Sequence, residues 1–381
     1  MNSTSGNISS VQGDYTECNS KDCQCPPINM TYIKGEVQEI HLNRSNHFRS
    51  ICTLNIYTKR TTGVVKLINI MPLRLVTRLT PKVGSTFMIN AIHYLNLGGN
   101  TDTIFSRPRK VIHESHFERM KQMYDPKTIS HVGALVFARN PYSRLFSAFV
   151  DKIFIVNSMG LAQSVRKFIN ANKNIDCVLD LEFSDFLKYA LYAKTRVIDD
   201  HYRPASDLLN VHTICHAREI FIVKQETFST DMEFLFTQRG LAPYKRDTLH
   251  RMVSCKRALS NVEELTYTSF LEFSNSVHHD CLNWNILTKR LWQSFQIQGY
   301  IHERSPLPKF EFSTKHDAQV FLRFVVEART EHPVSKEQSA LQRRKAITNV
   351  YNQVHESLKE DIVTQYHEDF ELFQYDPSSV I

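Results

Sequence analysis

The segment RLTPKVGSTFMINAIHYL, residues 78 to 95, predicts how this chain folds because it joins a strand to a helix through a short polar turn. The residues around its start, LRLVTRL at 73–79, read as a strand. Apolar side chains then recur at helical spacing, and Gly98-Gly99 end the predicted helix. The turn has a lysine ahead of its glycine and two hydroxyls after it. It lacks the G-x-x-x-x-G-K-[ST] pattern of nucleotide kinases.

This turn is a candidate phosphate site, because in a parallel sheet such turns lie at the carboxyl edge, where ligands bind. Gly84 lets the backbone approach a ligand, and the amides of the first helical turn point at an anion. Lys82 can place a positive charge on a bridging or leaving oxygen. The candidate residues are Pro81, Lys82, Val83, Gly84, Ser85, Thr86 and Phe87. A plain strand-to-helix turn with a Ser/Thr cap is the alternative.

A second segment, FARNPYSRLFSAFVDKI at 137–153, repeats this arrangement. It follows a predicted buried strand, GALVF at 133–137, and Pro141 suits the first position of the next helix. Arg139 at the strand tip and Ser147 on the helix can grip a second phosphate together, the arginine bidentately. The alternative is that Arg139 pairs with a carboxylate and Ser147 is a helix-surface hydroxyl.

The alternation of strands and helices predicts an α/β fold, in which a parallel sheet carries helices on its faces. A third strand is predicted at EIFIV, residues 219–223, followed by a helical stretch. Residues 240–345 lack this alternation, and we interpret them as a mostly helical insertion. The residues expected to hold a C-terminal helix against the core are Tyr366, Phe370 and Phe373.

Residues 1–50 read as a flexible stem, because small polar residues dominate and large apolar side chains are few. Clustered N-glycosylation acceptors indicate that this stem is luminal and glycosylated; they are Asn2, Asn7, Asn29 and Asn43. The stem holds four basic and five acidic residues, so its charge is −1; because the whole chain has a net charge of +7, the remaining chain carries +8. A positive folded part suits an anionic ligand.

The eight cysteines form an early and a late group of four. Even numbers suit disulfides, whereas free buried thiols suit a cytosolic protein, and both interpretations stay open. The spacing around Cys23 and Cys25 is not that of a strong zinc site. No signal peptide or membrane helix is visible, so a secretory route requires an anchor upstream of Met1.

Together, the two turns resemble those of sulfotransferases, and in particular the Golgi carbohydrate sulfotransferases of the chondroitin/dermatan 4-O type. PKVGST resembles their PKVGCT, and ARNPYSRLFSAFVDKI resembles their VREPFERLVSAYRDKF. Three further segments are similar to their HWRP, GKYET and Y-x-x-DFELFGY motifs: DDHYRP at 199–204, IVKQETF at 222–228 and YHEDFELFQY at 366–375. Ser85 stands where the family usually has Cys, and Tyr202 stands where it has Trp.

The resemblance implies a P-loop-like sulfotransferase fold, with a catalytic domain at 65–375. It implies transfer of a sulfuryl group from 3′-phosphoadenosine 5′-phosphosulfate (PAPS) to a glycan hydroxyl, without a metal. The first turn would hold the 5′-phosphosulfate, and Arg139 with Ser147 the 3′-phosphate. The expected partner is an anionic glycan or glycoprotein held in part by Arg203, and no nucleic acid is expected. The implied location is the Golgi lumen in a type II membrane family, with membrane contact only through a missing N-terminal anchor; secretion is the alternative.

Sulfuryl transfer needs a cation at the departing phosphate and a base for the acceptor hydroxyl. Lys82 is the expected cation. His113, His201 and Glu114 are the candidate bases, and histidine suits the task because its ordinary pKa lies near neutrality. Two other functions stay open: a non-catalytic, secreted glycan-binding relative, and a P-loop kinase. The position of the lysine and the lack of a clear strand-ending Asp for a metal speak against the kinase.

Overall fold

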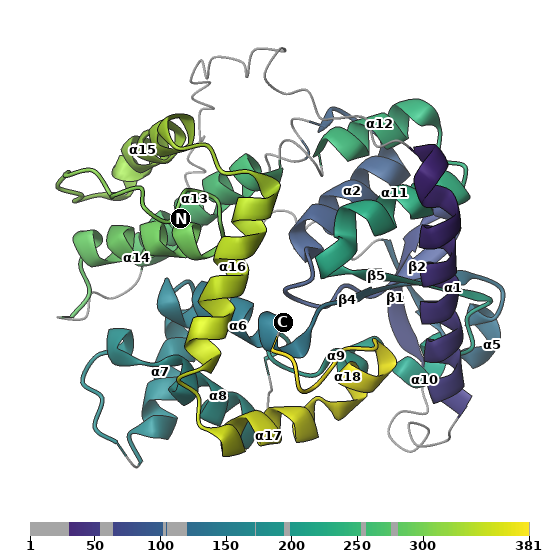
Figure 1. The fold of residues 1–381 in the computed structure, drawn as a ribbon, viewed down its shortest axis with the longest axis horizontal. Helices are drawn as coiled ribbons and strands as arrows, with labels where there is room; N and C mark the ends of the chain where they lie inside the picture. Colours follow the sequence, from purple (N-terminus) through teal and green to yellow (C-terminus); the bar gives the residue numbers. More distant parts are fainter. Residues whose placement is uncertain are drawn as a thin grey trace, which may run out of the picture.

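The structure is a computed structural model, and it describes residues 30–53, 64–101, 104, 120–171, 173–193, 199–252, 257–275 and 281–380. In this part of the chain, a five-stranded sheet has the order β3-β1-β2-β4-β5 (Figure 1). Its strands are β1 (Val65–Ile70), β2 (Leu75–Thr77), β3 (Lys121–Tyr124), β4 (Gly133–Ala138) and β5 (Glu219–Lys224). The three strands predicted from the sequence are β2, β4 and β5.

Strands β2, β4 and β5 run parallel, and β1 is antiparallel to both β2 and β3. The predicted α/β class is therefore confirmed, although the sheet is mixed rather than wholly parallel. The chain passes from β1 to β2 through a short 3₁₀ turn, Met71–Leu73, and left-handed Arg74. So short a connection permits an antiparallel pair, because a parallel pair needs a crossover of a dozen residues or more.

Alternate side chains of the central strands enter two different cores. Leu135 and Phe137 of β4 pack against α2 and α11, whereas Ala134 and Val136 pack against α1, α9, α10 and α18. Because β4 is covered on both faces, its sequence GALVFA is wholly apolar. These helices are α1 (Met30–Thr53), α2 (Ser85–Leu97), α9 (Ala205–Leu209), α10 (Val211–Ile214), α11 (Phe228–Gln238) and α18 (His367–Leu372).

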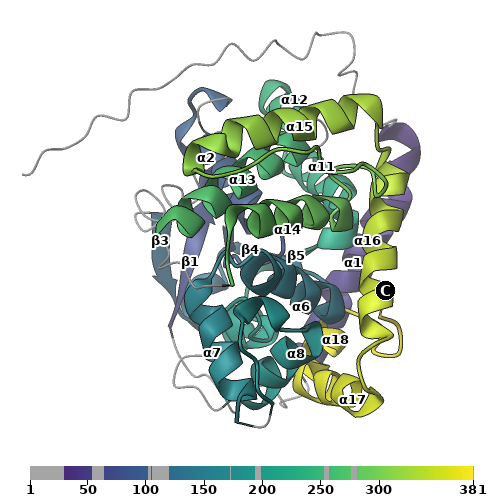
Figure 2. The same cartoon turned by 90° about the vertical axis from the view of Figure 1, so that its left-hand side faces the viewer.

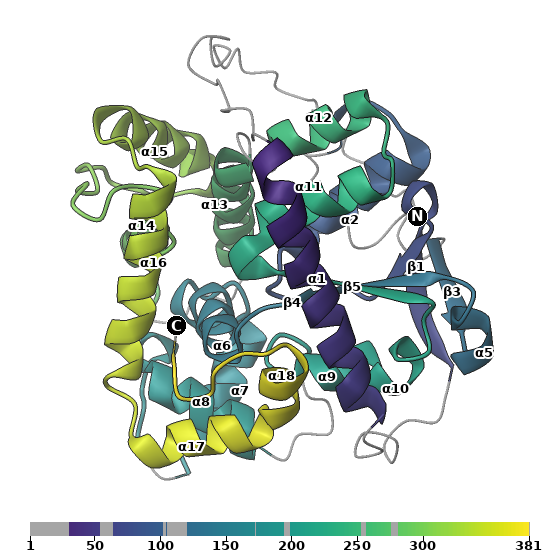
Figure 3. The same ribbon diagram turned by 45° about the vertical axis from the view of Figure 1, so that its right-hand side comes forward.

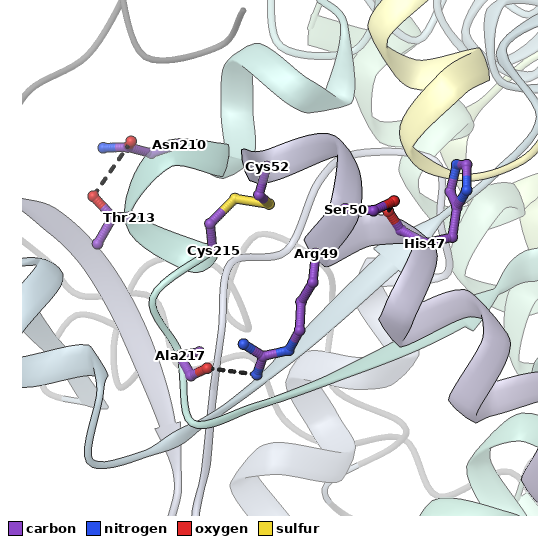
Figure 4. The surroundings of a disulfide bond; sticks show 8 residues. All are labelled: His47, Arg49, Ser50, Cys52, Asn210, Thr213, Cys215 and Ala217. Atoms are coloured by element: carbon purple, nitrogen blue, oxygen red, sulfur yellow. Dashed lines mark hydrogen bonds between the residues drawn. A yellow bond between two sulfur atoms is a disulfide. The ribbon is translucent and has the colours of Figure 1, made fainter. Parts of the chain in front are cut away.

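Helix α1 corrects the predicted extent of the flexible stem, because residues 30–50 belong to it. Figure 3 shows α1 lying across the edge of the sheet beside β5. Arg44 donates to the Ile222 carbonyl oxygen, and Arg49 donates to that of Ala217, so α1 covers an otherwise open sheet edge. A disulfide between Cys52 and Cys215 ties the end of α1 to the end of α10 (Figure 4).

Helices α6 to α8 and α13 to α17 form a second body beside the sheet, whereas α12 packs with α2 and α11 on the sheet side (Figures 1 and 2). One cluster joins α6, α7, α8, α14, α16 and α17, and another joins α13, α14 and α15. A second disulfide, Cys177–Cys281, connects the start of α8 to the start of α14. The bounds are α6 (Pro141–Phe149), α7 (Met159–Ile169), α8 (Phe183–Tyr192), α12 (Pro243–Arg251), α13 (Arg257–Asn275), α14 (Trp284–Ile297), α15 (Ala318–Glu331), α16 (Lys336–Tyr351) and α17 (Glu356–Gln365); a four-residue helix, α5 (Pro126–Ile129), follows β3.

Residues 240–345 thus contain α12 to α15 and most of α16. In the described ranges, no single helix is long and apolar enough to span a bilayer. The pair Pro141–Phe154 and Met159–Ile169 passes that test jointly, by length and composition alone, with a bend of 100° between its halves.

Candidate functional site

The first predicted phosphate turn lies between β2 and α2, at the carboxyl edge of the parallel strands. Gly84 is the N-cap of α2, with φ 85°, and no side chain caps the helix. The Ser/Thr-capped alternative is therefore not the geometry seen, and the first amides of α2 have no acceptor within the helix. Lys82 is also left-handed, with φ 70°, which costs about 1–2 kcal/mol in a residue with a Cβ. Val83 and Phe87 are buried in the core, so only their backbone groups are available to a ligand.

The second predicted turn lies at the neighbouring strand, β4. Asn140 caps α6 by accepting a hydrogen bond from the Ser143 backbone N–H at 3.2 Å. Arg139 Nε donates to Ser143 Oγ at 2.9 Å. Ser143 and Ser147 are the two residues of α6 that are not fully buried, and their spacing of four places them on one face. Arg139, Ser143 and Ser147 therefore line the accessible side of this helix start.

One hydrogen bond joins the two turns: Arg139 Nη1 donates to the carbonyl oxygen of Lys82 at 2.9 Å. The parallel pairing of β2 with β4 brings them together, because it aligns the carboxyl ends of both strands. Arg139 and Lys82, which are 57 residues apart, thus belong to one site. That contact also fixes the backbone of the left-handed Lys82.

Burial lowers the pKa of Arg139 to about 10, while the nearby Glu226 opposes that shift and Arg343 of α16 adds to it. The guanidinium stays charged at neutral pH. Glu226 is engaged elsewhere as well, since its carboxylate accepts the Asn140 N–H and the Tyr375 hydroxyl, each at 2.9 Å. Because Arg139 is a partly desolvated cation, an anion bound beside it gains more than it would in water.

The ammonium of Lys82 contacts Asp151, which lies in the π-helical turn that follows α6. The same Asp151 oxygen lies 3.6 Å from Lys152 Nζ, and its other oxygen accepts from Asn157 at 3.1 Å. Ser269 of α13 donates in turn to Asn157 at 2.8 Å. Two buried ammonium groups thus share one carboxylate, which leaves an excess of positive charge beside the first turn.

His201 is the candidate base that the structure describes, whereas His113 and Glu114 lie outside the described residues. The pKa of His201 is lowered, first by burial and then by Lys152 and Lys82, while its hydrogen bond to Asp199 opposes the shift. His201 thus shares its electrostatic surroundings with both lysines. Arg203, on the same loop, lies 3.5 Å from Asp200. The pKa of Arg78 is lowered first by burial and also by the charge of Arg203, while Asp200 opposes the shift.

The sequence analysis missed the groups that hold the loop carrying His201. Arg144 is fully buried and donates to the carbonyl oxygen of Arg203. Tyr366 donates to that of Tyr202, so this tyrosine does more than fill the core. Asp369 accepts from the Ala205 and Ser206 amides at 2.7 Å each. Arg144 and Asp369 both lie in segments that resemble the family motifs, but the sequence does not reveal their partners.

Several predictions concern the surroundings of the site. Asn43 is exposed on α1, whereas Asn2, Asn7 and Asn29 lie outside the described residues, so glycosylation stays a prediction. Among the residues that the structure describes, no three His, Cys, Asp or Glu side chains are grouped to hold a metal ion.

Comparison with known proteins gives one result. Residues 72–245 match the model of the sulfotransferase family. No significant match was found among curated proteins or among solved structures. The matched range includes both turns, the π-helical turn with Asp151 and the loop with His201. It supports a sulfotransferase family member and sulfuryl transfer in general.

Proposed function

Because the match to the sulfotransferase family spans both turns, we propose that this protein transfers a sulfuryl group from PAPS to a hydroxyl of a glycan. The observation that carries the proposal is the hydrogen bond from Arg139 to the Lys82 carbonyl oxygen. Because the two turns are in contact, a single nucleotide could bind with one end at each turn. The α2 amides and Lys82 would take the 5′-phosphosulfate, and Arg139 with Ser143 and Ser147 would take the 3′-phosphate.

The proposed reaction requires three events at named atoms. The acceptor oxygen forms a bond to sulfur, and the bond between sulfur and the bridging phosphate oxygen breaks. The hydroxyl proton passes to Nε2 of His201, whose pKa is lowered first by burial and then by the charges of Lys152 and Lys82. Lys82 and Lys152 offset the negative charge that grows on the departing phosphate. Asp151 holds both lysines in place, so the cations need little reorganisation during the step.

The acceptor in this proposal is an anionic glycan or glycoprotein of the chondroitin/dermatan type. Arg203 is exposed enough to meet an acceptor carboxylate or sulfate, and the chain carries a net charge of +7. The disulfides Cys52–Cys215 and Cys177–Cys281 support an oxidising compartment, which agrees with the proposed Golgi location or with secretion. The glycosylation acceptors of the first 45 residues favour the same route.

Two alternatives remain candidates. A non-catalytic glycan-binding relative would bind the acceptor without turnover. The intact pairing of Lys82, Asp151 and Arg139 argues against it, because a protein that needs no donor has no reason to keep it. A P-loop kinase would need ATP and magnesium. In kinases the lysine directly follows the glycine of the loop, whereas here Lys82 precedes Gly84.

Calorimetry with adenosine 3′,5′-bisphosphate and with ATP plus magnesium separates these functions. We expect the bisphosphate to bind and ATP to bind far more weakly. Lys82→Ala and Arg139→Ala should each raise the Kd of the bisphosphate by about 30-fold or more, since truncating a buried charged partner costs about 2–5 kcal/mol. Lys127→Ala and Arg323→Ala, at exposed positions on α5 and α15, are the matched controls.

Labelled PAPS then tests turnover on a panel of chondroitin, dermatan and glycoprotein acceptors. Sulfate transfer that is lost in Lys82→Ala supports the enzyme. A folded protein that does not bind the bisphosphate would rule the proposal out. Binding of a glycan without transfer across the whole panel would favour the non-catalytic relative.

A further inference from the structure

We infer that Asp199 is a positioning residue, which holds the His201 ring so that Nε2 is free of hydrogen and accepts the proton of the acceptor hydroxyl. The inference rests on the proposed function, in which His201 is the base. Asp199 lies two residues ahead of His201, outside the groups to which the proposed function assigns the donor. It touches neither the donor turns nor the acceptor in this scheme, and it acts through the imidazole.

The geometry of the pair defines the tautomer. Asp199 Oδ1 lies 2.5 Å from His201 Nδ1, and the same oxygen accepts the His201 backbone N–H at 2.8 Å. An ionised carboxylate only accepts hydrogen bonds, so Nδ1 carries the hydrogen. A neutral imidazole has one N–H, and therefore Nε2 presents its lone pair. The backbone contact fixes the carboxylate relative to the ring, which limits rotation of both side chains.

The loop that carries the pair is held from several sides. The Asp199 carbonyl oxygen accepts the Tyr202 and Arg203 amides at 3.2 Å each. Arg144 of α6 donates to the carbonyl oxygen of Arg203. Tyr366, which follows α17, donates to that of Tyr202. A ring oriented by Asp199 on such a fixed loop needs little reorganisation during catalysis.

The charged groups that act on the ring come from three segments: Lys82 from the β2–α2 turn, Lys152 from the π-helical turn, and Asp199 from the loop itself. Burial and the two lysines lower the pKa of His201, and the hydrogen bond to Asp199 raises it. Burial alone would raise the pKa of Asp199, but its hydrogen bonds and charge contact with His201 and the charge of Lys152 together lower it. At neutral pH the ring is thus neutral beside an ionised carboxylate. When Nε2 takes the proton, the resulting imidazolium is stabilised by Asp199, as in other His–Asp pairs.

The first test is independent of any acceptor. Two-dimensional ¹H–¹⁵N spectra of protein with ¹⁵N-labelled histidine report which ring nitrogen is protonated, and His201 is assigned from the spectrum of His201→Gln. We expect the Nδ1–H form in the wild type and a shift toward the Nε2–H form in Asp199→Asn, because the amide can itself donate to Nδ1. Asp200→Asn is the matched control, since Asp200 pairs with Arg203. An Nε2–H wild type, or a tautomer unaffected by Asp199→Asn, would overturn the inference.

The second test uses turnover. Asp199→Asn should lower kcat by about 100-fold or more, the lower bound for general-base catalysis, while the Kd of adenosine 3′,5′-bisphosphate stays unchanged. The acidic limb of its pH profile should move to lower pH, because the contact that raises the pKa of His201 is weakened. Asp200→Asn should retain the wild-type limb. If Asp199→Asn keeps the kcat of the wild type, the inference is overturned. If the wild-type protein never binds the bisphosphate, the proposed function is wrong, and the tautomer measurement alone decides whether Asp199 orients His201.

Discussion

At the scale of single residues, Asp151 decides how much positive charge the site offers to an anion. Its carboxylate contacts Lys82 and Lys152, and the side chains of Lys82 and Asp151 are only 10% and 8% exposed. Asp151→Asn removes the carboxylate that both ammonium groups contact. We expect the free energy of unfolding to fall by about 3 kcal/mol, as when one partner of a buried ion pair is removed.

An anionic ligand should replace the missing carboxylate in that variant. Adenosine 3′,5′-bisphosphate is therefore expected to stabilise Asp151→Asn more than it stabilises the wild type, and chemical denaturation with and without the ligand measures the difference. Asp247→Asn, at an exposed position in α12, is the control. Equal stabilisation of both proteins would contradict a shared lysine site.

Lys152 offers a test of the sign of the electrostatic coupling at His201. Its charge lowers the pKa of the imidazole, so Lys152→Met should raise that pKa. Because the base acts in its neutral form, the acidic limb of kcat/KM against pH should move to higher pH. Lys167→Met, on the exposed face of α7, should leave the limb in place. A limb that moves to lower pH would show that another group is titrating.

Residues of the two turns were predictable because their signal is local: a strand end, a glycine or proline, and a helix start within a dozen positions. Their partners were not, since the Lys82–Asp151 contact spans 69 residues. Asp151 was visible only as part of a motif resemblance, with no hint that it binds Lys82. Asp199 likewise appeared only within the DDHYRP segment, with no hint of its role, because a carboxylate two residues before a histidine has many structural explanations.

At the scale of elements, α18 serves as a clamp on the loop that carries His201. Asp369 is 1% exposed and accepts two backbone N–H groups at the start of α9. Asp369→Asn should lower the free energy of unfolding by about 1.5–3 kcal/mol, the contribution of a hydrogen bond to a charged group. Amide exchange at Ala205 and Ser206 should become faster. Asp376→Asn is the control, because that exposed carboxylate bonds within its own turn; unchanged exchange at both amides would contradict the clamp.

Helix α1 shows why part of the fold was missed. Its inward residues recur every three or four positions, and they are Val37, His41, Arg44, Phe48 and Ile51. Two of these five are polar, so the segment resembles a solvated stem in composition. They are accommodated because Asp231 lies 3.4 Å from His41 and 2.8 Å from Arg44. The sequence of α1 does not reveal such a long-range ion pair. The strands β4 and β5 could be predicted because their sequences are apolar.

At the scale of the whole molecule, each disulfide joins parts that are distant in the chain. Cys52–Cys215 spans 163 residues and fixes α1 to α10 on the sheet side. Cys177–Cys281 spans 104 residues and fixes the start of α8 to the start of α14 in the helical body. The sequence grouped the cysteines by position and left their pairing open, because the pairing depends on which distant elements the fold brings together.

These crosslinks predict a stability that depends on the redox state. Replacing both members of either pair by serine should lower the free energy of unfolding by about 2–4 kcal/mol, since a closed loop limits the freedom of the unfolded chain. The Cys52/Cys215 variant should in addition expose the edge of β5 to amide exchange, because α1 loses its tether there. The Cys177/Cys281 variant should leave β5 protected and loosen α14 instead.

Peptide mapping without reductant identifies the pairs, and denaturation with and without reductant measures their contribution. Wild-type stability that does not respond to reductant would mean that the four thiols are free, and it would remove the main structural support for an oxidising compartment.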